Sequence, residues 1–227
     1  MRRRAFGFGR RFIALNLYVL LPATVSLAAG QNAADPRDEW QQPSRVVHDL
    51  NLKPGATVAD IGCGTGYLTF WLARAVGEKG KVFATDISAN TLKNIRDRIE
   101  REHLTNIETI QSAPTETKLK PDCCDSALLC QVLHEVPEAQ RQPLVQSVAK
   151  AIKPGGFLFI IDWKKSHEAP QGVHFDPYDQ KIPREDLVKM AANAGLQLDA
   201  EFLYLKYQVF LRFRKPLNSS GAKEGGR

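Results

Sequence analysis

Two carboxylates flank a glycine-rich turn in the first half of the chain. Asp60 ends an apolar run, Gly62, Gly64 and Gly66 follow at alternate positions, and Asp86 ends the next apolar run. Alternate glycines let the backbone pass close to a ligand. Asp60 would repel a phosphate but would attract an ammonium or a sulfonium. Asp86 can accept hydrogen bonds from both hydroxyls of a ribose. The pattern predicts a ligand that joins an adenosine to a positively charged amino acid and has no phosphate: S-adenosylmethionine.

The spacing of the glycines argues against a dinucleotide. A pyrophosphate-binding turn has the pattern Gly-x-Gly-x-x-Gly. Here the third glycine, Gly66, falls one residue early, and the bulky Tyr67 follows it. A nicotinamide-dependent oxidoreductase is therefore disfavoured.

Three side chains in the second half of the chain are candidate general bases: His134, Glu135 and Asp162. His134 follows a strongly apolar run, and Asp162 ends the next one. Methyl transfer needs proximity, orientation and, for some acceptors, a base that removes a proton. We expect His134 and Asp162 to be catalytic residues; the alternatives are a structural role at a helix entry for His134 and an ion pair with a neighbouring lysine for Asp162.

The elements that must position these residues alternate between strands and helices. Strands are expected at 57–61, 81–86, 107–111, 126–131 and 157–162, and helices at 67–76, 89–103, 137–152 and 183–195. A further helix begins at a Ser44 cap, Ser88 caps the helix from residue 89, and a tight turn occupies 153–156. This order predicts an α/β fold with a doubly wound, mostly parallel, seven-stranded sheet. The last strands, 196–204 and 207–213, would form an antiparallel hairpin.

Four segments resemble class I S-adenosylmethionine-dependent methyltransferases. The run D-I-G-C-G-T-G from Asp60 looks like their motif I, and Asp86 matches their ribose-binding acid. Residues 130–136 (C-Q-V-L-H-E-V) resemble the motif after the fourth strand, and residues 153–158 the turn into the fifth. The resemblance covers about residues 39–214 and points to the small-molecule group near the ubiquinone/menaquinone-biosynthesis C-methyltransferases. It implies a Rossmann-like methyltransferase fold and transfer of a methyl group to a small-molecule acceptor by in-line displacement.

The resemblance also assigns the cofactor-binding residues by position. They are Asp60, Gly62, Cys63, Gly64, Thr65, Gly66, Asp86, Ile87, Ser112, Ala113 and Gln131. Ser112 departs from the family, which commonly has an acid there to bind the adenine amino group, and a hydroxyl makes a weaker hydrogen bond. This departure leaves an alternative: a non-catalytic protein of the same fold that binds S-adenosylmethionine or S-adenosylhomocysteine.

Several residues are candidates for the acceptor side of the site. The loop 166–179, which contains His167 and His174, is expected to cover the acceptor. Trp40 and Gln41 either form a lid over the cofactor or pack against the body of the protein. Tyr207 and Gln208 on the last strands are further candidates for the acceptor side. No Cys/His spacing matches a zinc site, so no metal is expected.

The N-terminus has the three parts of a secretory signal. Residues 1–29 contain five arginines and no acid, the segment 12–29 is mostly apolar, and small-x-small patterns occur near Ala28. This predicts a signal peptide or membrane anchor, with an exported, periplasmic or membrane-anchored protein. A mitochondrial or cytoplasmic location is the alternative. The methyl donor is made in the cytosol, which conflicts with export.

The remaining chain is almost neutral. Without residues 1–29 there are 26 basic and 25 acidic residues, which disfavours a nucleic-acid partner. We expect a linker at 30–43, the methyltransferase domain at 44–216 and a disordered tail at 217–227.

Overall fold

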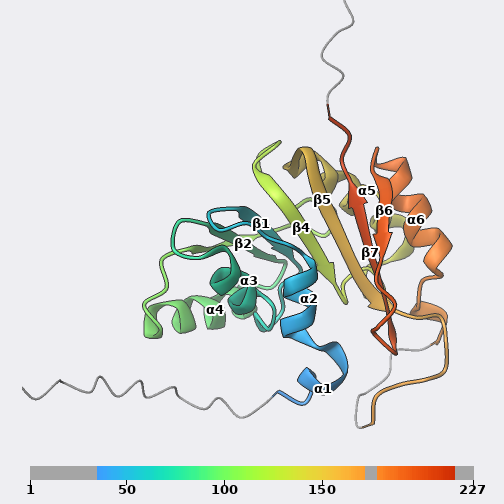
Figure 1. Cartoon of the computed structure of the whole chain (residues 1–227), viewed down its shortest axis with the longest axis horizontal. Helices are drawn as coiled ribbons and strands as arrows, with labels where there is room; N and C mark the ends of the chain where they lie inside the picture. Colours follow the sequence, from blue (N-terminus) through green and yellow to red (C-terminus); the bar gives the residue numbers. More distant parts are fainter. Residues whose placement is uncertain (1–34, 172–177, 218–227) are drawn as a thin grey trace, which may run out of the picture. The chain divides into compact units, whose positions relative to one another are not determined.

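The computed structural model describes residues 35–171 and 178–217 (Figure 1). The predictions for residues 1–29, for His174 and for residues 218–227 lie outside these described residues. In the described part, no helix combines the length and the apolar character needed to span a bilayer.

Seven strands form one sheet in the order β3-β2-β1-β4-β5-β7-β6. The strands are β1 (Thr57–Ile61), β2 (Lys81–Asp86), β3 (Ile107–Gln111), β4 (Cys124–Cys130), β5 (Ile152–Trp163), β6 (Gln197–Glu201) and β7 (Gln208–Arg214). The first five strands pair in parallel, whereas β7 pairs antiparallel with both β5 and β6. The predicted doubly wound, mostly parallel sheet with an antiparallel C-terminal pair is confirmed. The strand order reverses between β1 and β4, where sheets of this kind bind ligands.

Helices cover both faces of the sheet. They are α1 (Asp38–Gln41), α2 (Pro43–Asp49), α3 (Thr69–Val76), α4 (Ala89–Arg101), α5 (Glu138–Ala151) and α6 (Arg184–Asn193), with a short 3₁₀ turn η1 (Tyr178–Gln180) before α6. Figure 1 shows α2, α3 and α4 on one side and α5 and α6 on the other. The carboxyl ends of β1, β2 and β4 therefore open between two packed layers.

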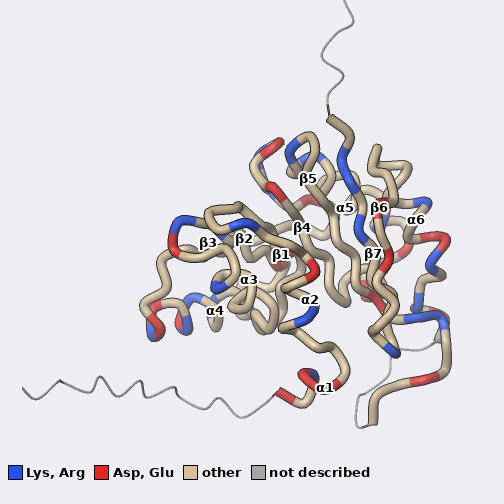
Figure 2. The backbone as a smooth tube through the Cα atoms, in the orientation of Figure 1, with Lys and Arg blue, Asp and Glu red and all other residues tan. Residues whose placement is uncertain are grey.

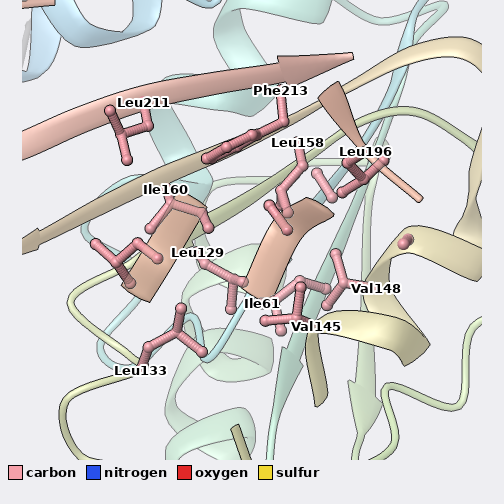
Figure 3. Close-up of a cluster of buried hydrophobic side chains, with 14 of the residues drawn as sticks. Ile61, Leu129, Leu133, Val145, Val148, Leu158, Ile160, Leu196, Leu211 and Phe213 are labelled. Atoms are coloured by element: carbon pink, nitrogen blue, oxygen red, sulfur yellow. The ribbon is translucent and has the colours of Figure 1, made fainter. Parts of the chain in front are cut away.

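The core has two main parts because side chains of a strand alternate between its faces. On β5, Leu158 and Ile160 pack toward α5 and α6, in the cluster shown in Figure 3. Phe159 and Ile161 point the other way and pack in a second cluster with α2 and α3. With apolar layers on both faces, the central strands are held rigidly and present their ends at fixed positions.

The register shifts once between β4 and β5 and once between β6 and β7, and the sequence partly indicated the first of these irregularities. The expected turn at 153–156 lies inside β5, where the register against β4 shifts between Cys124 and Ser126. Gly155 has φ +81°, and a Cβ on Gly156 would lie 2.5 Å from the carbonyl oxygen of Asp125. The turn is therefore a bulge in a longer strand.

Two expected helix starts had different outcomes. The predicted cap on Ser88 is confirmed, because its side chain accepts a hydrogen bond from the Thr91 N–H. The predicted cap on Ser44 is wrong: α2 begins at Pro43, after Gln42 in the left-handed conformation. Proline suits the first position of a helix because its missing N–H would have no partner there.

Basic and acidic residues are mixed along the described chain (Figure 2). Basic and acidic residues are therefore nearly equal in number and also interspersed along the chain. This charge distribution adds no support for nucleic-acid binding.

Candidate active site

A cavity of about 540 Å³ opens at the carboxyl ends of β1, β2, β3 and β4. Every predicted cofactor-binding residue except Gly66 lines it. The cavity wall therefore brings together residues that are more than 70 positions apart in the sequence, from Asp60 to Gln131. Gly66 is the neighbour of Thr65 and Tyr67, which both line it.

The three glycines of the turn have left-handed backbones but different surroundings. Their φ angles are +68° at Gly62, +51° at Gly64 and +80° at Gly66. An added Cβ would lie 2.6 Å from Val132 at Gly62 and 2.7 Å from Phe70 at Gly66, whereas at Gly64 no atom lies within 4 Å. Gly62 and Gly66 thus allow close packing within the protein. Gly64 leaves open space on the cavity side for a ligand.

Asp86 connects β2 to the glycine turn. Its carboxylate accepts hydrogen bonds from the backbone N–H of Gly64 at 3.0 Å and of Ser88 at 2.8 Å. Ser112 adds a backbone bond to the Asp86 carbonyl oxygen at 2.9 Å. The ends of β1, β2 and β3 are thereby fixed to one another, with the Asp86 carboxylate at the cavity wall.

Asp60 is a buried carboxyl on the same wall. It is only 3% exposed, and Thr69 Oγ1 donates a hydrogen bond to it at 2.6 Å. Burial raises the pKa of Asp60 to about 6; the Thr69 hydrogen bond lowers it and the Asp86 charge raises it. An ionised Asp60 is costly without a cation beside it, so this wall favours a positively charged ligand.

Gln131 marks the end of β4 with an unusual backbone. Its φ is +57°, and its N–H donates to the Ile161 carbonyl oxygen at 2.7 Å. A left-handed conformation is uncommon for a residue other than glycine and is often found at functional sites. It occurs here where the cavity wall passes from β4 to the following loop.

The segment before β1 also contributes to the cavity. Arg37 and Gln41 line it, within the range expected to be a linker. Gln41 is buried and its Nε2 donates to Cys130 Sγ at 2.8 Å, while Tyr67 donates to the Asp38 carboxylate at 2.7 Å. These bonds hold α1 against the body of the protein.

The two predicted catalytic residues form a buried pair. His134 Nδ1 lies 2.6 Å from Asp162 Oδ1, and the same carboxylate accepts the backbone N–H of His134 at 3.3 Å and of Trp163 at 2.8 Å. Neither side chain lines the cavity formed by the described residues. Asp162 pairs with His134, whereas the alternative considered for it was an ion pair with a neighbouring lysine. The other imidazole nitrogen lies 3.9 Å from Glu135, which does line the cavity.

The cavity has further walls that the motifs did not assign to ligand binding. They comprise Pro114, Val132, Val136, Pro137, Gln140 and Leu144 beyond the strand ends, together with Tyr67 and Leu68 after the glycine turn. Val132, Val136 and Pro137 come from the loop after β4 and Leu144 from α5, whereas Pro114 follows β3 and Leu68 precedes α3. The run 130–136, singled out as a family motif, contains Val132 and Val136 and could have located that part of the wall.

Comparison with known proteins identifies the kind of domain to which this cavity belongs. The family model described as a methyltransferase domain matches residues 58–156. The chain is 30% identical over 174 residues to a 2-phytyl-1,4-naphtoquinone methyltransferase from Thermosynechococcus vestitus, covering 75% of this chain and 72% of that protein.

Two further relatives support the same grouping. A ubiquinone/menaquinone biosynthesis C-methyltransferase from Vibrio vulnificus is 31% identical over 127 residues, which cover 56% of this chain and 48% of the relative, so that match spans about half of its length. The crystal structure of an SAM-dependent methyltransferase from Aquifex aeolicus superimposes with a TM-score of 0.73 at 25% identity, covering 80% of this chain and 94% of that one.

The different surroundings of Gly62 and Gly64 predict opposite outcomes for the same substitution. Gly64→Ala should weaken binding of S-adenosylhomocysteine at least tenfold, at a stability cost of about 1 kcal/mol for the left-handed backbone. Gly62→Ala should destabilise the fold by roughly 2–4 kcal/mol, because the methyl group collides with Val132. Urea unfolding and isothermal titration calorimetry measure the two effects.

A second substitution serves as the control. Val132→Ala should restore part of the stability of Gly62→Ala and none of the binding of Gly64→Ala. Equal losses of stability in both glycine variants would contradict this division of roles.

The buried carboxyl predicts how cofactor affinity depends on pH. S-adenosylmethionine should bind most tightly above about pH 6 and lose about tenfold per pH unit below it, because a protonated Asp60 no longer attracts the cation. Asp60→Asn should bind weakly at every pH and show a flat profile. Titration calorimetry between pH 5 and 8 tests this.

The stability of the protein without cofactor should change in the opposite sense. The pKa of Asp60 is higher in the folded chain than in the unfolded one, so this group's contribution to stability is present below about pH 4 and is lost as the pH rises through about 6. Asp60→Asn should therefore raise stability at pH 7.5 by roughly 1–3 kcal/mol. A loss of stability in this variant would show that Asp60 has a structural role.

Proposed function

The chain belongs to the S-adenosylmethionine-dependent methyltransferases, and we propose that it methylates a small aromatic acceptor of the quinol type. The observation that carries the proposal is the likeness to the naphthoquinone methyltransferase, at 30% identity over 72% of that protein's length. The apolar side of the cavity, formed by Val132, Val136 and Leu144, is consistent with an acceptor of this kind.

S-adenosylmethionine is the methyl donor, and the residues of the cavity fit it. We assign Asp60 to the amino-acid end, Asp86 to the ribose hydroxyls and Ser112 to the adenine, with Gln131 beside the methionine part. The buried acid, the open face of Gly64 and the polar strand ends support this assignment. When bound, the cofactor supplies a methyl group already activated by its sulfonium charge.

The charge balance of methyl transfer defines what the protein must add. A cationic donor and a neutral acceptor give two neutral products and one proton, so the acceptor must lose a proton. We assign the uptake of this proton to His134 and a positioning role to Asp162. Their 2.6 Å contact supports this, because an Nδ1–H directed at Asp162 leaves Nε2 as the acceptor, on the side of Glu135. Asp162 holds the imidazole in that orientation.

The proposal predicts labelled product from a defined acceptor. The full chain, incubated with methyl-labelled S-adenosylmethionine and chemically reduced 2-phytyl-1,4-naphthoquinone, should yield a methylated naphthoquinone detected by mass spectrometry. The reduced ring is the expected substrate because it is electron-rich. Phenolic, amine and thiol acceptors of similar size form the comparison panel, and transfer only to one of those would contradict the quinol assignment.

The same assay tests the role of His134. His134→Gln should lower kcat about 10²- to 10⁴-fold, with little effect on binding of S-adenosylhomocysteine. Asp162→Asn should shift the pH dependence of kcat, since it disturbs the orientation of the imidazole. If His134→Gln keeps the wild-type kcat, the imidazole has a structural role only.

We also propose that residues 1–29 direct export or anchor the chain to a membrane. The support is the arginine-rich start, the apolar segment 12–29 and the small residues near Ala28. Such a location suits an acceptor that is itself apolar and held in a membrane.

Fractionation of cells that express the full chain tests this location. The protein should be found in the membrane or exported fraction, and N-terminal sequencing should show either an intact anchor or a new N-terminus close to residue 29. Recovery of the intact chain in the soluble cytosol would contradict the proposal.

A further inference from the structure

Two residues at the edge of the cofactor-binding end of the sheet face each other across β5 and β7. Trp163 ends β5 and is the direct partner of Gln208, the first residue of β7. Residues opposite each other in an antiparallel pair project to the same face. That face is the one on which Ile161 and Phe210 pack with α2 and α3.

The Gln208 side chain has no hydrogen bond despite being buried. It is 1% exposed, and within the described residues neither its amide nitrogen nor its oxygen has a partner. Buried amides are nearly always paired, so an exception of this kind needs an explanation. An apolar residue of the same size would avoid the cost of desolvating an unpaired amide, which indicates that the amide has a use other than packing.

Trp40 of α1 packs on Trp163, the strand partner of Gln208. Its ring stacks on Trp163 with a centroid separation of 5.4 Å and an interplanar angle of 28°. Trp40 itself is only partly buried. A side chain of a four-residue helix therefore stacks on the flat aromatic face of Trp163.

This face of Trp163 adjoins both the cofactor cavity and the buried pair. Gln41, next to Trp40, lines the cavity and donates to Cys130, which is the register partner of Ile161 on β5. The His134 ring also lies near Trp163, edge-on and with ring centroids 6.5 Å apart. A ring bound on Trp163 would thus lie close to both the cofactor cavity and the buried pair.

We propose that the acceptor ring binds on Trp163, in the place that Trp40 occupies in this structure, with its ring oxygens hydrogen-bonded to the Gln208 amide. The amide can both donate and accept, so it suits a ring that carries hydroxyl or carbonyl groups. Displacement of Trp40 exchanges one stacked ring for another. This inference rests on the proposed function, since it names the binding site of the quinol acceptor.

Binding of a quinone without turnover tests the site directly. The probe is 2,3-dimethyl-1,4-naphthoquinone, whose substituted ring positions cannot add the chain's cysteine thiols. Its affinity for the full chain, saturated with S-adenosylhomocysteine, is measured by equilibrium dialysis. Quenching of tryptophan fluorescence in a Trp71→Phe background reports where it binds, because Trp40 and Trp163 are then the only tryptophans of the chain.

The variants have distinct expected results. Gln208→Leu should lower the affinity for the probe about tenfold. The thermal stability of this variant should equal or exceed that of the wild type, since an unpaired buried amide is removed. Trp163→Ala should abolish detectable binding. Trp40→Ala should bind the probe several-fold more tightly, because the competing indole is absent. Trp71→Phe, a change on α3, is the matched control and should leave the affinity unchanged.

Three results would overturn the inference: wild-type chain that does not bind the probe, wild-type affinity in both Gln208→Leu and Trp163→Ala, or loss of binding in Trp40→Ala. A role of Gln208 in packing alone predicts unchanged affinity in the stable Gln208→Leu variant. The proposed function fails separately, if quinones bind at Trp163 as described but no reduced quinone is methylated.

Discussion

A carboxyl group buried at the end of the first strand is the constraint on which the site depends. Asp60 is only 3% exposed although it lines the cavity, and burial raises its pKa to about 6. Its charge is therefore costly until a cation arrives. We propose on this ground that the carboxyl favours the sulfonium and ammonium of the methyl donor over a phosphate. The neighbouring Asp86 is used differently, because its carboxylate is already satisfied by the N–H groups of Gly64 and Ser88.

Such a strained site needs a rigid support, and the sheet provides it. The central strands are packed on both faces, with Leu158 and Ile160 against α5 and α6, and Phe159 and Ile161 against α2 and α3. The unfavourable features, including the buried acid and the left-handed Gln131, lie at the strand ends. The packed core thus keeps these groups in conformations and surroundings that are unfavourable for them individually.

Patterns within short stretches of the sequence predicted the secondary structure and the residues that line the cavity. The order of strands and helices followed from apolar periodicity, and the cavity residues from Asp60 to Gln131 followed from the family motifs. Pairings between distant segments could not be predicted in this way. The contact of His134 with Asp162 and the stack of Trp40 on Trp163 arise from tertiary packing. Residues 30–43 were predicted to be a linker because the four-residue helix α1 is too short to produce a recognisable apolar periodicity.

Proton release on cofactor binding tests the central claim most directly. Calorimetric titration with S-adenosylmethionine at pH 6, repeated in buffers with different ionisation enthalpies, gives the number of protons released per site. If Asp60 titrates near pH 6 and ionises to meet the cation, about half a proton should be released by the wild type and none by Asp60→Asn. Equal proton release by the two proteins would contradict the account of this carboxyl.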